Sequence, residues 1–124
     1  MTIPAHYVRK LNLKNDTINL THGAGGLATA QLIEEVFAKH LTNTWLDEGH
    51  DGALLPPITH PVAVSCDAHV VTPLFFPGGD IGRLAVAGTV NDVAVCGAKP
   101  LYIAATFILE EGLSLSVLDR IVQS

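Results

Sequence analysis

Three aspartates stand at positions where carboxylate chemistry is expected. Asp51, Asp67 and Asp92 each adjoin the end of an expected strand or helix, rather than lying in a run of solvated charges. Mg²⁺ that is bound together with a nucleotide typically takes one or two carboxylates, several waters and phosphate oxygens. We therefore expect these three acids to act as the metal ligands of one site, and Asp92 to be its catalytic candidate.

Asp92 is the most informative of the three because it falls on the apolar stripe of an expected helix. That stripe is formed by Ile81, Leu84, Ala85, Gly88 and Val95, which recur at helical spacing. Burying a carboxylate without a partner is costly, so the position predicts a cation, a hydrogen-bond cluster or a water-filled cleft. The alternative is that Asp92 caps or salt-bridges a neighbouring element. Asn91, the preceding residue, is a candidate nucleotide contact, and its alternative is an exposed helix residue.

A glycine cluster lies between an expected strand and an expected helix. Gly23, Gly25 and Gly26 would offer backbone N–H groups and a helix N-terminus to a phosphate. No Gly-Lys-Ser/Thr follows, so this is not a Walker A loop. The dinucleotide pattern is matched through Ala28, but the turn-rich stretch 43–57 stands where its second strand should come. A flexible turn is the alternative interpretation.

Other residues carry weaker signals. The six histidines show no metal-binding spacing, although His22 adjoins the glycine cluster and His69 adjoins Asp67. The acidic pair at 110–111 is a second candidate for assisting a metal, with a solvated turn as its alternative. The Phe-Phe pair at 75–76 is expected to be an interface or core plug.

The pattern predicts an alternation of strands and helices. Strands are expected at 17–20, 53–55, 62–67 and 101–109. Helices are expected over 27–40, from the N-cap Asp80 to a stop at Gly97 and Pro100, and from Ser114 or Ser116 onward. Ser116 and Asp119 have the spacing of a capping box.

Composition narrows the class of protein. The 124 residues fit one domain, of which 1–16 is expected to be a flexible leader. A hydrophobic fraction of 48% beside a charged fraction of 15% favours a buried subunit or domain interface. The net charge of -5, with no basic stripe, argues against nucleic acid as a partner.

The cysteines and the chain ends give further expectations. Cys66 and Cys96 have no metal-site spacing, and both are expected to be small buried hydrophobes. No apolar run has membrane-spanning length and the start lacks the apolar core of a signal peptide, so the cytoplasm is the expected location. The sequence ends at Ser124 inside an amphipathic segment without a C-cap, which favours a truncated piece of a longer protein.

Taken together, the motifs resemble the N-terminal domain of the HypE hydrogenase maturation factors, within the aminoimidazole ribonucleotide synthetase-like superfamily. The resemblance covers about residue 18 to the C-terminus. The stretches that carry it are His22-Gly-Ala-Gly-Gly26, Asp51-Gly-Ala-Leu-Leu55, Asp67 through Pro77-Gly-Gly-Asp-Ile-Gly82, Gly88-Thr-Val-Asn-Asp92 and Phe107-Ile-Leu-Glu-Glu-Gly112.

The resemblance implies a fold and a site. The fold is an α+β domain with a mixed or antiparallel sheet and helices on one face, and the sheet pairs with a second copy into a barrel across a homodimer. Residues 17–124 would be the ATP-binding N-terminal domain, truncated at its C-terminal end. ATP and Mg²⁺ would lie at the interface, with Asp51, Asp67 and Asp92 as metal or phosphate ligands, Asn91 at the nucleotide and residues 23–26 as the mobile loop near the phosphates.

The resemblance also implies an activity. Family members use ATP to dehydrate a carbamoyl group, held on their own C-terminal cysteine, to a thiocyanate that supplies cyanide ligands for the iron of [NiFe]-hydrogenase. The implied partners are the carbamoyltransferase HypF and the HypC–HypD scaffold. Because neither Cys66 nor Cys96 matches the acceptor cysteine, this chain alone is expected to lack dehydratase activity. Another superfamily enzyme, of the selenophosphate synthetase or thiamine-monophosphate kinase type, and a dimerisation or docking module are the alternatives.

Overall fold

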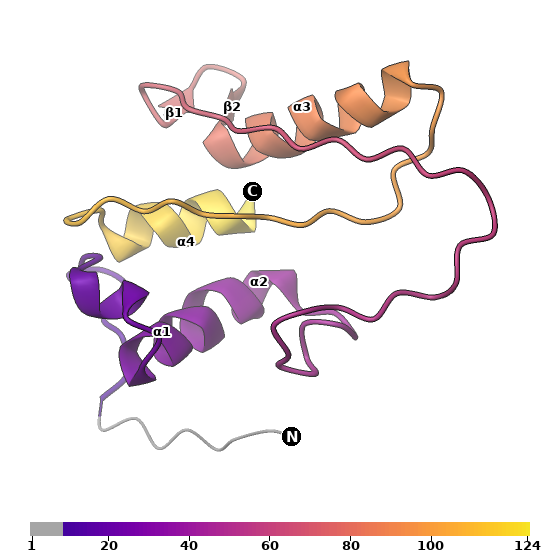
Figure 1. Ribbon diagram of the computed structural model, residues 1–124. Helices are drawn as coiled ribbons and strands as arrows, with labels where there is room; N and C mark the ends of the chain where they lie inside the picture. The colour runs from indigo at the N-terminus through magenta and orange to yellow at the C-terminus, as the bar shows by residue number, and fades with distance from the viewer. Residues whose placement is uncertain (1–8) are drawn as a thin grey trace. The chain divides into compact units, whose positions relative to one another are not determined.

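The computed structural model describes residues 9–124, which form two compact units (Figure 1). The first unit runs to Leu55 and resumes over Ile108–Gln123, and the second holds Pro56–Phe107 and Ser124. In chain order the elements are the 3₁₀ turn η1 (Leu20–Gly23), α1 (Leu27–Leu32), the π-helical turn η2 (Ile33–Phe37), α2 (Ala38–Leu41), β1 (Phe75–Phe76), β2 (Gly79–Asp80), α3 (Ile81–Val95) and α4 (Leu115–Gln123). Helices and a small antiparallel sheet make this an α+β chain, as predicted.

The helices α1, η2 and α2 follow one another without a break in the first unit. They confirm the helix predicted over 27–40, although its middle turn is π-helical. Two of its apolar side chains, Leu32 and Val36, are buried. This helical run therefore supplies one wall of the core.

The core of the first unit forms where α4 packs against this run. Its buried members are Ile18, Leu32, Val36, Leu115, Leu118 and Val122. Because the buried leucines and valine of α4 share one helix face, burial of that face stabilises the helix. Leu11 and Leu13, which belong to the predicted leader, pack against the same core. Residues 1–8 of that leader lie outside the described part of the chain.

A short backbone pairing joins the beginning of the first unit to the entrance of α4. Ile18 N–H donates to Leu113 C=O and Gly112 N–H donates to Ile18 C=O, both at 2.8 Å. The strand predicted over 17–20 is thereby reduced to one antiparallel bridge between Thr17 and Ser114. The extended backbone does not continue beyond residue 19, because Asn19 caps the 3₁₀ turn η1 that begins at the next residue.

The second unit contains a hairpin that leads directly into α3. Phe75 pairs with Asp80 and Phe76 with Gly79, around a turn in which Gly78 has φ +92°. Asp80 then caps α3 by accepting a hydrogen bond from Arg83 N–H at 3.1 Å, as predicted. The predicted aromatic pair is thus a half-buried strand of this hairpin.

The end of α3 also follows the prediction. Gly97 has φ +73°, and its N–H donates to Ala94 C=O at 2.9 Å. Ala98 N–H donates to Val93 C=O at 3.3 Å. These two bonds are the Schellman arrangement, which needs a residue that tolerates positive φ.

The strands predicted at 53–55, 62–67 and 101–109 were wrong as paired elements, because none of these segments forms a strand ladder. The segments follow long uncoiled paths (Figure 1), and many of their apolar side chains are exposed, among them Val62, Val64, Leu101 and Ile103. Cys66 and Cys96 are exposed rather than buried, since no neighbouring strand covers them. Within residues 9–124, no helix is long and apolar enough to cross a membrane.

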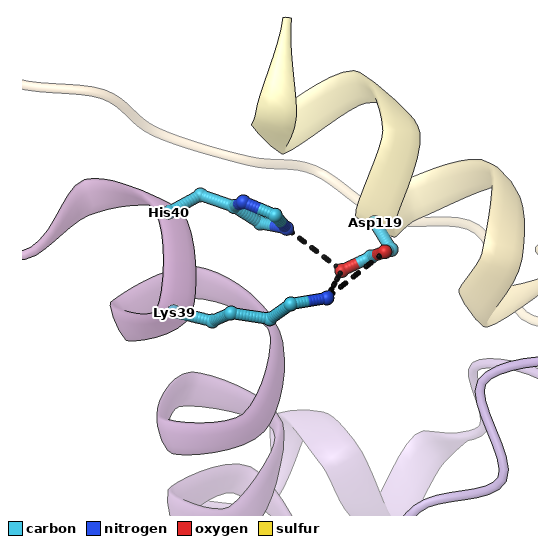
Figure 2. A network of polar contacts seen from close by, with 3 residues as sticks. All are labelled: Lys39, His40 and Asp119. Carbon is cyan, nitrogen blue, oxygen red and sulfur yellow. Dashed lines mark hydrogen bonds and ion pairs between the residues drawn. The ribbon is translucent and has the colours of Figure 1, made fainter.

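An ionic network fastens α4 to α2 within the first unit (Figure 2). Asp119 Oδ1 lies 2.8 Å from His40 Nε2 and 3.0 Å from Lys39 Nζ. Asp119 therefore does not serve the predicted capping box with Ser116. The helix instead begins at Leu115, and Ser114 C=O accepts from Val117 N–H and Leu118 N–H at its start. The sequence spacing gave no sign of this pairing because Asp119 and His40 are far apart along the chain.

Asp119 makes the stability of the first unit dependent on pH. Burial raises the pKa of Asp119, but the hydrogen bonds from His40 and Lys39 outweigh burial and hold this pKa below its ordinary value of 3.8. A depressed carboxyl pKa contributes stability that is present above the unfolded-state pKa and is lost as pH falls through the folded-state value. We therefore expect Asp119→Asn to lower the free energy of unfolding by up to about 1 kcal/mol above about pH 5.

Urea unfolding of wild type and Asp119→Asn across pH tests this expectation. The difference between the two should shrink as the pH falls below 3.8 and Asp119 in the wild type becomes protonated. Asp47→Asn, which removes an exposed acid of the same unit, is the matched control and should show no such difference. A gap that stays constant down to the acid limit would contradict the assignment.

Candidate functional site

The helix α3 presents Asp92 to solvent rather than burying it. None of the residues of α3 is buried, so the expectation that Asp92 lies on a buried stripe was wrong. The reason is that this part of the second unit has no paired sheet to cover the helix. Asp92 has instead one neutral partner, because Ser65 Oγ donates to its Oδ2 at 3.0 Å. The carboxylate is thus accessible to a ligand while one of its oxygens is held by Ser65.

Asp67 lies on the segment that carries Ser65. Its Oδ1 accepts from the N–H of Ala68 at 2.7 Å, and its Oδ2 lies 3.4 Å from Nε2 of His69. The Asp67 side chain is 45% exposed, whereas that of His69 is only 15% exposed. A solvent-facing carboxylate therefore stands beside a largely covered imidazole.

The ring of His69 is covered by α3 at Gly88, where the missing side chain leaves room for it. A Cβ placed on Gly88 would lie 2.4 Å from His69 Nε2 and 3.2 Å from its Cε1. Carbon cannot approach a ring atom that closely, so the ring fits only because residue 88 lacks a side chain. The segment therefore contacts α3 at two points, Ser65 on Asp92 and His69 on Gly88. Ser65, Asp67 and His69 alternate along the segment, which is the spacing of side chains that share one face of an extended chain.

Asp51, the third predicted metal ligand, belongs to the first unit. It is exposed in the loop that follows α2. Asn43 Oδ1 accepts from Trp45 N–H and Leu46 N–H at 3.1 Å, and Trp45 Nε1 donates to Leu54 C=O at 3.2 Å. These bonds close the loop on either side of Asp51. Its role as a metal ligand stays a prediction.

The glycine cluster also belongs to the first unit, between η1 and α1. Gly25 has φ +75°, and its N–H donates to Thr29 Oγ1 at 3.0 Å. His22, a candidate by its position, has a structural task, because its Nδ1 accepts from Asn19 N–H at 3.0 Å in the cap of η1. The residues from Gly23 to Gly26 are exposed, although the N–H groups of Ala24 and Gly25 already have partners within the loop. Its nucleotide role, like that of exposed Asn91 on α3, stays a prediction.

The donors fit a nucleotide-bound magnesium better than a closed metal cage. Across residues 9–124, no three side chains of His, Cys, Asp or Glu gather as a ligand cluster. Mg²⁺ that is shared with phosphates needs only one or two carboxylates, and Asp67 and Asp92 supply hard oxygen donors on partly open side chains. Asp67 and Asp92 are linked by one segment, because Asp67 lies on it and Asp92 accepts a hydrogen bond from its Ser65.

Sequence reasoning missed Ser65 and Thr29, and it did not foresee the link between His69 and Gly88. Ser65 had a readable signal, because it stands two residues before Asp67 and so shares its face. Thr29 stands four residues after Gly25, within reach of a helix N-terminus. The meeting of His69 with Gly88 depends on how the segment lies along α3, which no local pattern gives.

Residues 49–124 match the family model described as AIR synthase related protein, N-terminal domain. The match spans more than half of the chain, so the chain belongs to this family. The resemblance inferred from the motifs is confirmed.

Relatives and a solved structure narrow the comparison. Carbamoyl dehydratase HypE of Cupriavidus necator is 56% identical over 99% of this chain and 35% of its own length. Its namesake from Escherichia coli is 47% identical over 88% of this chain and 34% of its own length. A crystal structure of hydrogenase maturation protein HypE in complex with ATP superposes with TM-score 0.80 and 50% identity, over 84% of this chain and 31% of that one. The chain thus spans about a third of the length of these proteins.

The glycine loop yields a test of local geometry. We expect Gly25→Ala to lower the free energy of unfolding by about 1 kcal/mol, because its φ of +75° is unfavourable for a residue with a Cβ. Gly23→Ala is the matched control, since residue 23 has no such φ and a Cβ there meets nothing within 4 Å. Urea unfolding of both variants measures the difference. Equal losses would show that backbone strain at Gly25 is not what shapes this loop.

Proposed function

We propose that this chain carries a nucleotide-binding and magnesium-binding part of an ATP-dependent carbamoyl dehydratase of hydrogenase maturation. The observation that carries the proposal is the pair of open carboxylates, Asp67 and Asp92, connected through the segment that contacts α3. It is supported by family membership and by the likeness to HypE solved with ATP. An adjoining set of hard oxygen donors is what a nucleotide-bound magnesium requires.

Each residue has a part in this proposal. Asp67 and Asp92 hold Mg²⁺, and Asp51 is a third ligand. Asn91 contacts the nucleotide, and the exposed loop that contains Gly23, Gly25 and Gly26 faces its phosphates. Mg²⁺ held by these carboxylates would supply positive charge against the negative charge of the phosphates. Ser65 keeps Asp92 oriented, because its hydroxyl donates to one carboxylate oxygen and leaves the other available.

For the whole protein we propose dehydration of an S-carbamoyl group on its own C-terminal cysteine. ATP phosphorylates the carbamoyl oxygen, and this oxygen leaves as phosphate while the nitrogen gives up its two protons and a C≡N bond forms. The product thiocyanate supplies the cyanide ligands of the [NiFe]-hydrogenase iron. The carbamoyltransferase HypF and the HypC–HypD scaffold are the proposed partners, and the cytoplasm is the proposed location.

Dimerisation through the sheet into a barrel is the assembly part of the proposal. Its support is the set of segments that form no ladder and yet expose apolar side chains. Val64 is 86% exposed and Leu101 is 64% exposed. Apolar extended segments of this kind are stabilised when a second chain supplies neighbouring strands.

The proposal predicts magnesium-dependent ATP binding that needs Asp92. In calorimetric titrations with ATP, the wild type should bind with Mg²⁺, and Asp92→Asn should bind at least about tenfold more weakly, since losing even an outer partner of a metal site has this effect. Asp47→Asn removes the same charge from an exposed loop position that the proposal does not use, and should bind like the wild type.

Two results would contradict the proposal. One is wild-type binding that is the same with and without Mg²⁺. The other is an Asp92→Asn variant that binds Mg²⁺ and ATP as tightly as the control.

A further inference from the structure

We propose that His69 is a positioning residue for the metal site. Its ring packs against α3 at residue 88, where there is room for it only because that residue is glycine, and from there it holds Asp67 in place. This inference rests on the proposed function and deepens it. It assigns a task to a histidine that makes no direct contact with nucleotide or metal in the scheme above, and to a glycine in the middle of a helix.

The first step is the contact chain from helix to carboxylate. His69 Nε2 occupies the place where a side chain on Gly88 would begin, 2.4 Å from an ideal Cβ. The same nitrogen lies 3.4 Å from Asp67 Oδ2. One ring atom therefore faces both the backbone of α3 and the carboxylate, so the position of the ring on the helix decides where that carboxylate rests.

The second step is the way in which the segment is held at both ends. Ser65 Oγ donates to Asp92 Oδ2 at 3.0 Å, four residues along the helix from Gly88. Asp67 lies between Ser65 and His69 on the segment and shares their spacing. The Asp67 carboxylate itself is contacted on Oδ1 by Ala68 N–H and on Oδ2 by His69 Nε2, and a carboxylate held in this way loses fewer rotamers when it binds a cation. Contacts between α3 and this one segment thus set the positions of both Asp67 and Asp92.

The third step is the cost of keeping a glycine there. Glycine in a helix interior is unfavourable relative to alanine, so a helix gains nothing from Gly88 by itself. The atom that an added Cβ would meet is the far end of a rotatable side chain, so alanine displaces the ring and leaves the helix intact. Gly88→Ala is therefore a probe that moves His69 without unfolding the protein.

Four variants separate positioning from packing. His69→Phe keeps a ring over Gly88 but removes the nitrogen that faces Asp67, and His69→Gln restores a polar nitrogen without the ring. Gly88→Ala displaces the ring, and the double variant His69→Phe with Gly88→Ala tests whether the two changes act through one contact. His60→Phe, an exposed histidine of the same unit, is the matched control.

The experiment is calorimetric titration with ATP, with and without Mg²⁺, beside thermal unfolding of each variant. We expect His69→Phe and Gly88→Ala to weaken magnesium-dependent ATP binding by about tenfold, the double variant to weaken it no further, and His69→Gln to return close to wild type. ATP binding without Mg²⁺, the unfolding midpoints of the His69 variants and all properties of His60→Phe should match the wild type. Gly88→Ala should unfold no earlier than the wild type.

The contrary outcomes are distinct. If the wild type shows magnesium-dependent binding and His69→Phe matches it, the positioning role is overturned while the proposed function stands. If the variants weaken ATP binding equally with and without Mg²⁺, His69 only packs the segment and the inference falls. If the wild type itself shows no dependence on Mg²⁺, the proposed function falls and this inference falls with it.

Discussion

A strand is stable only when its backbone groups are hydrogen-bonded to a neighbouring strand, and this constraint governs the second unit. Its segments at 62–67 and 101–107 have the apolar pattern of buried strands but form no ladder, so side chains such as Val64 and Leu101 remain exposed. The same constraint explains why α3 buries none of its residues and why both cysteines face solvent. The first unit does not depend on strand pairing in this way. Its α4 packs an apolar face directly on a helical run, with only a single bridge between Thr17 and Ser114.

No sheet covers α3 in the described part of the chain. The positions of Asp67 and Asp92 therefore depend on the contacts that the segment from Ser65 to His69 makes with this helix. Ser65 reaches Asp92, and His69 enters the space that Gly88 leaves open. These contacts are few and polar, so they leave both carboxylates accessible to solvent. An acid that serves a nucleotide-bound cation needs this combination of a fixed direction and an open oxygen.

The elements set by local chemistry could be predicted from the sequence. Asp80 as the cap of α3, Gly97 as its stop and the helix over 27–40 depend on residues that are near one another in the chain, and all three are found. Whether the predicted strands form hydrogen-bonded ladders could not be predicted from local sequence, because strand pairing depends on residues far away in the chain. For the site, the sequence singled out Asp67 and Asp92 but gave the wrong environment for Asp92, and the seat of His69 on Gly88 depends on a tertiary register that periodicity does not encode. The Asp119 network was missed for the same reason.

The central claim is that Asp67 and Asp92 belong to one site that holds a nucleotide-bound cation. The most direct measurement replaces Mg²⁺ by paramagnetic Mn²⁺ and records the backbone amide NMR signals of the chain as substoichiometric Mn²⁺ and ATP are added. The account predicts that the signals of Asp67, Ala68, Asn91 and Asp92 broaden first, while those of core residues such as Val36 persist. Broadening elsewhere in the chain while the signals of Asp67 and Asp92 stay sharp would contradict it.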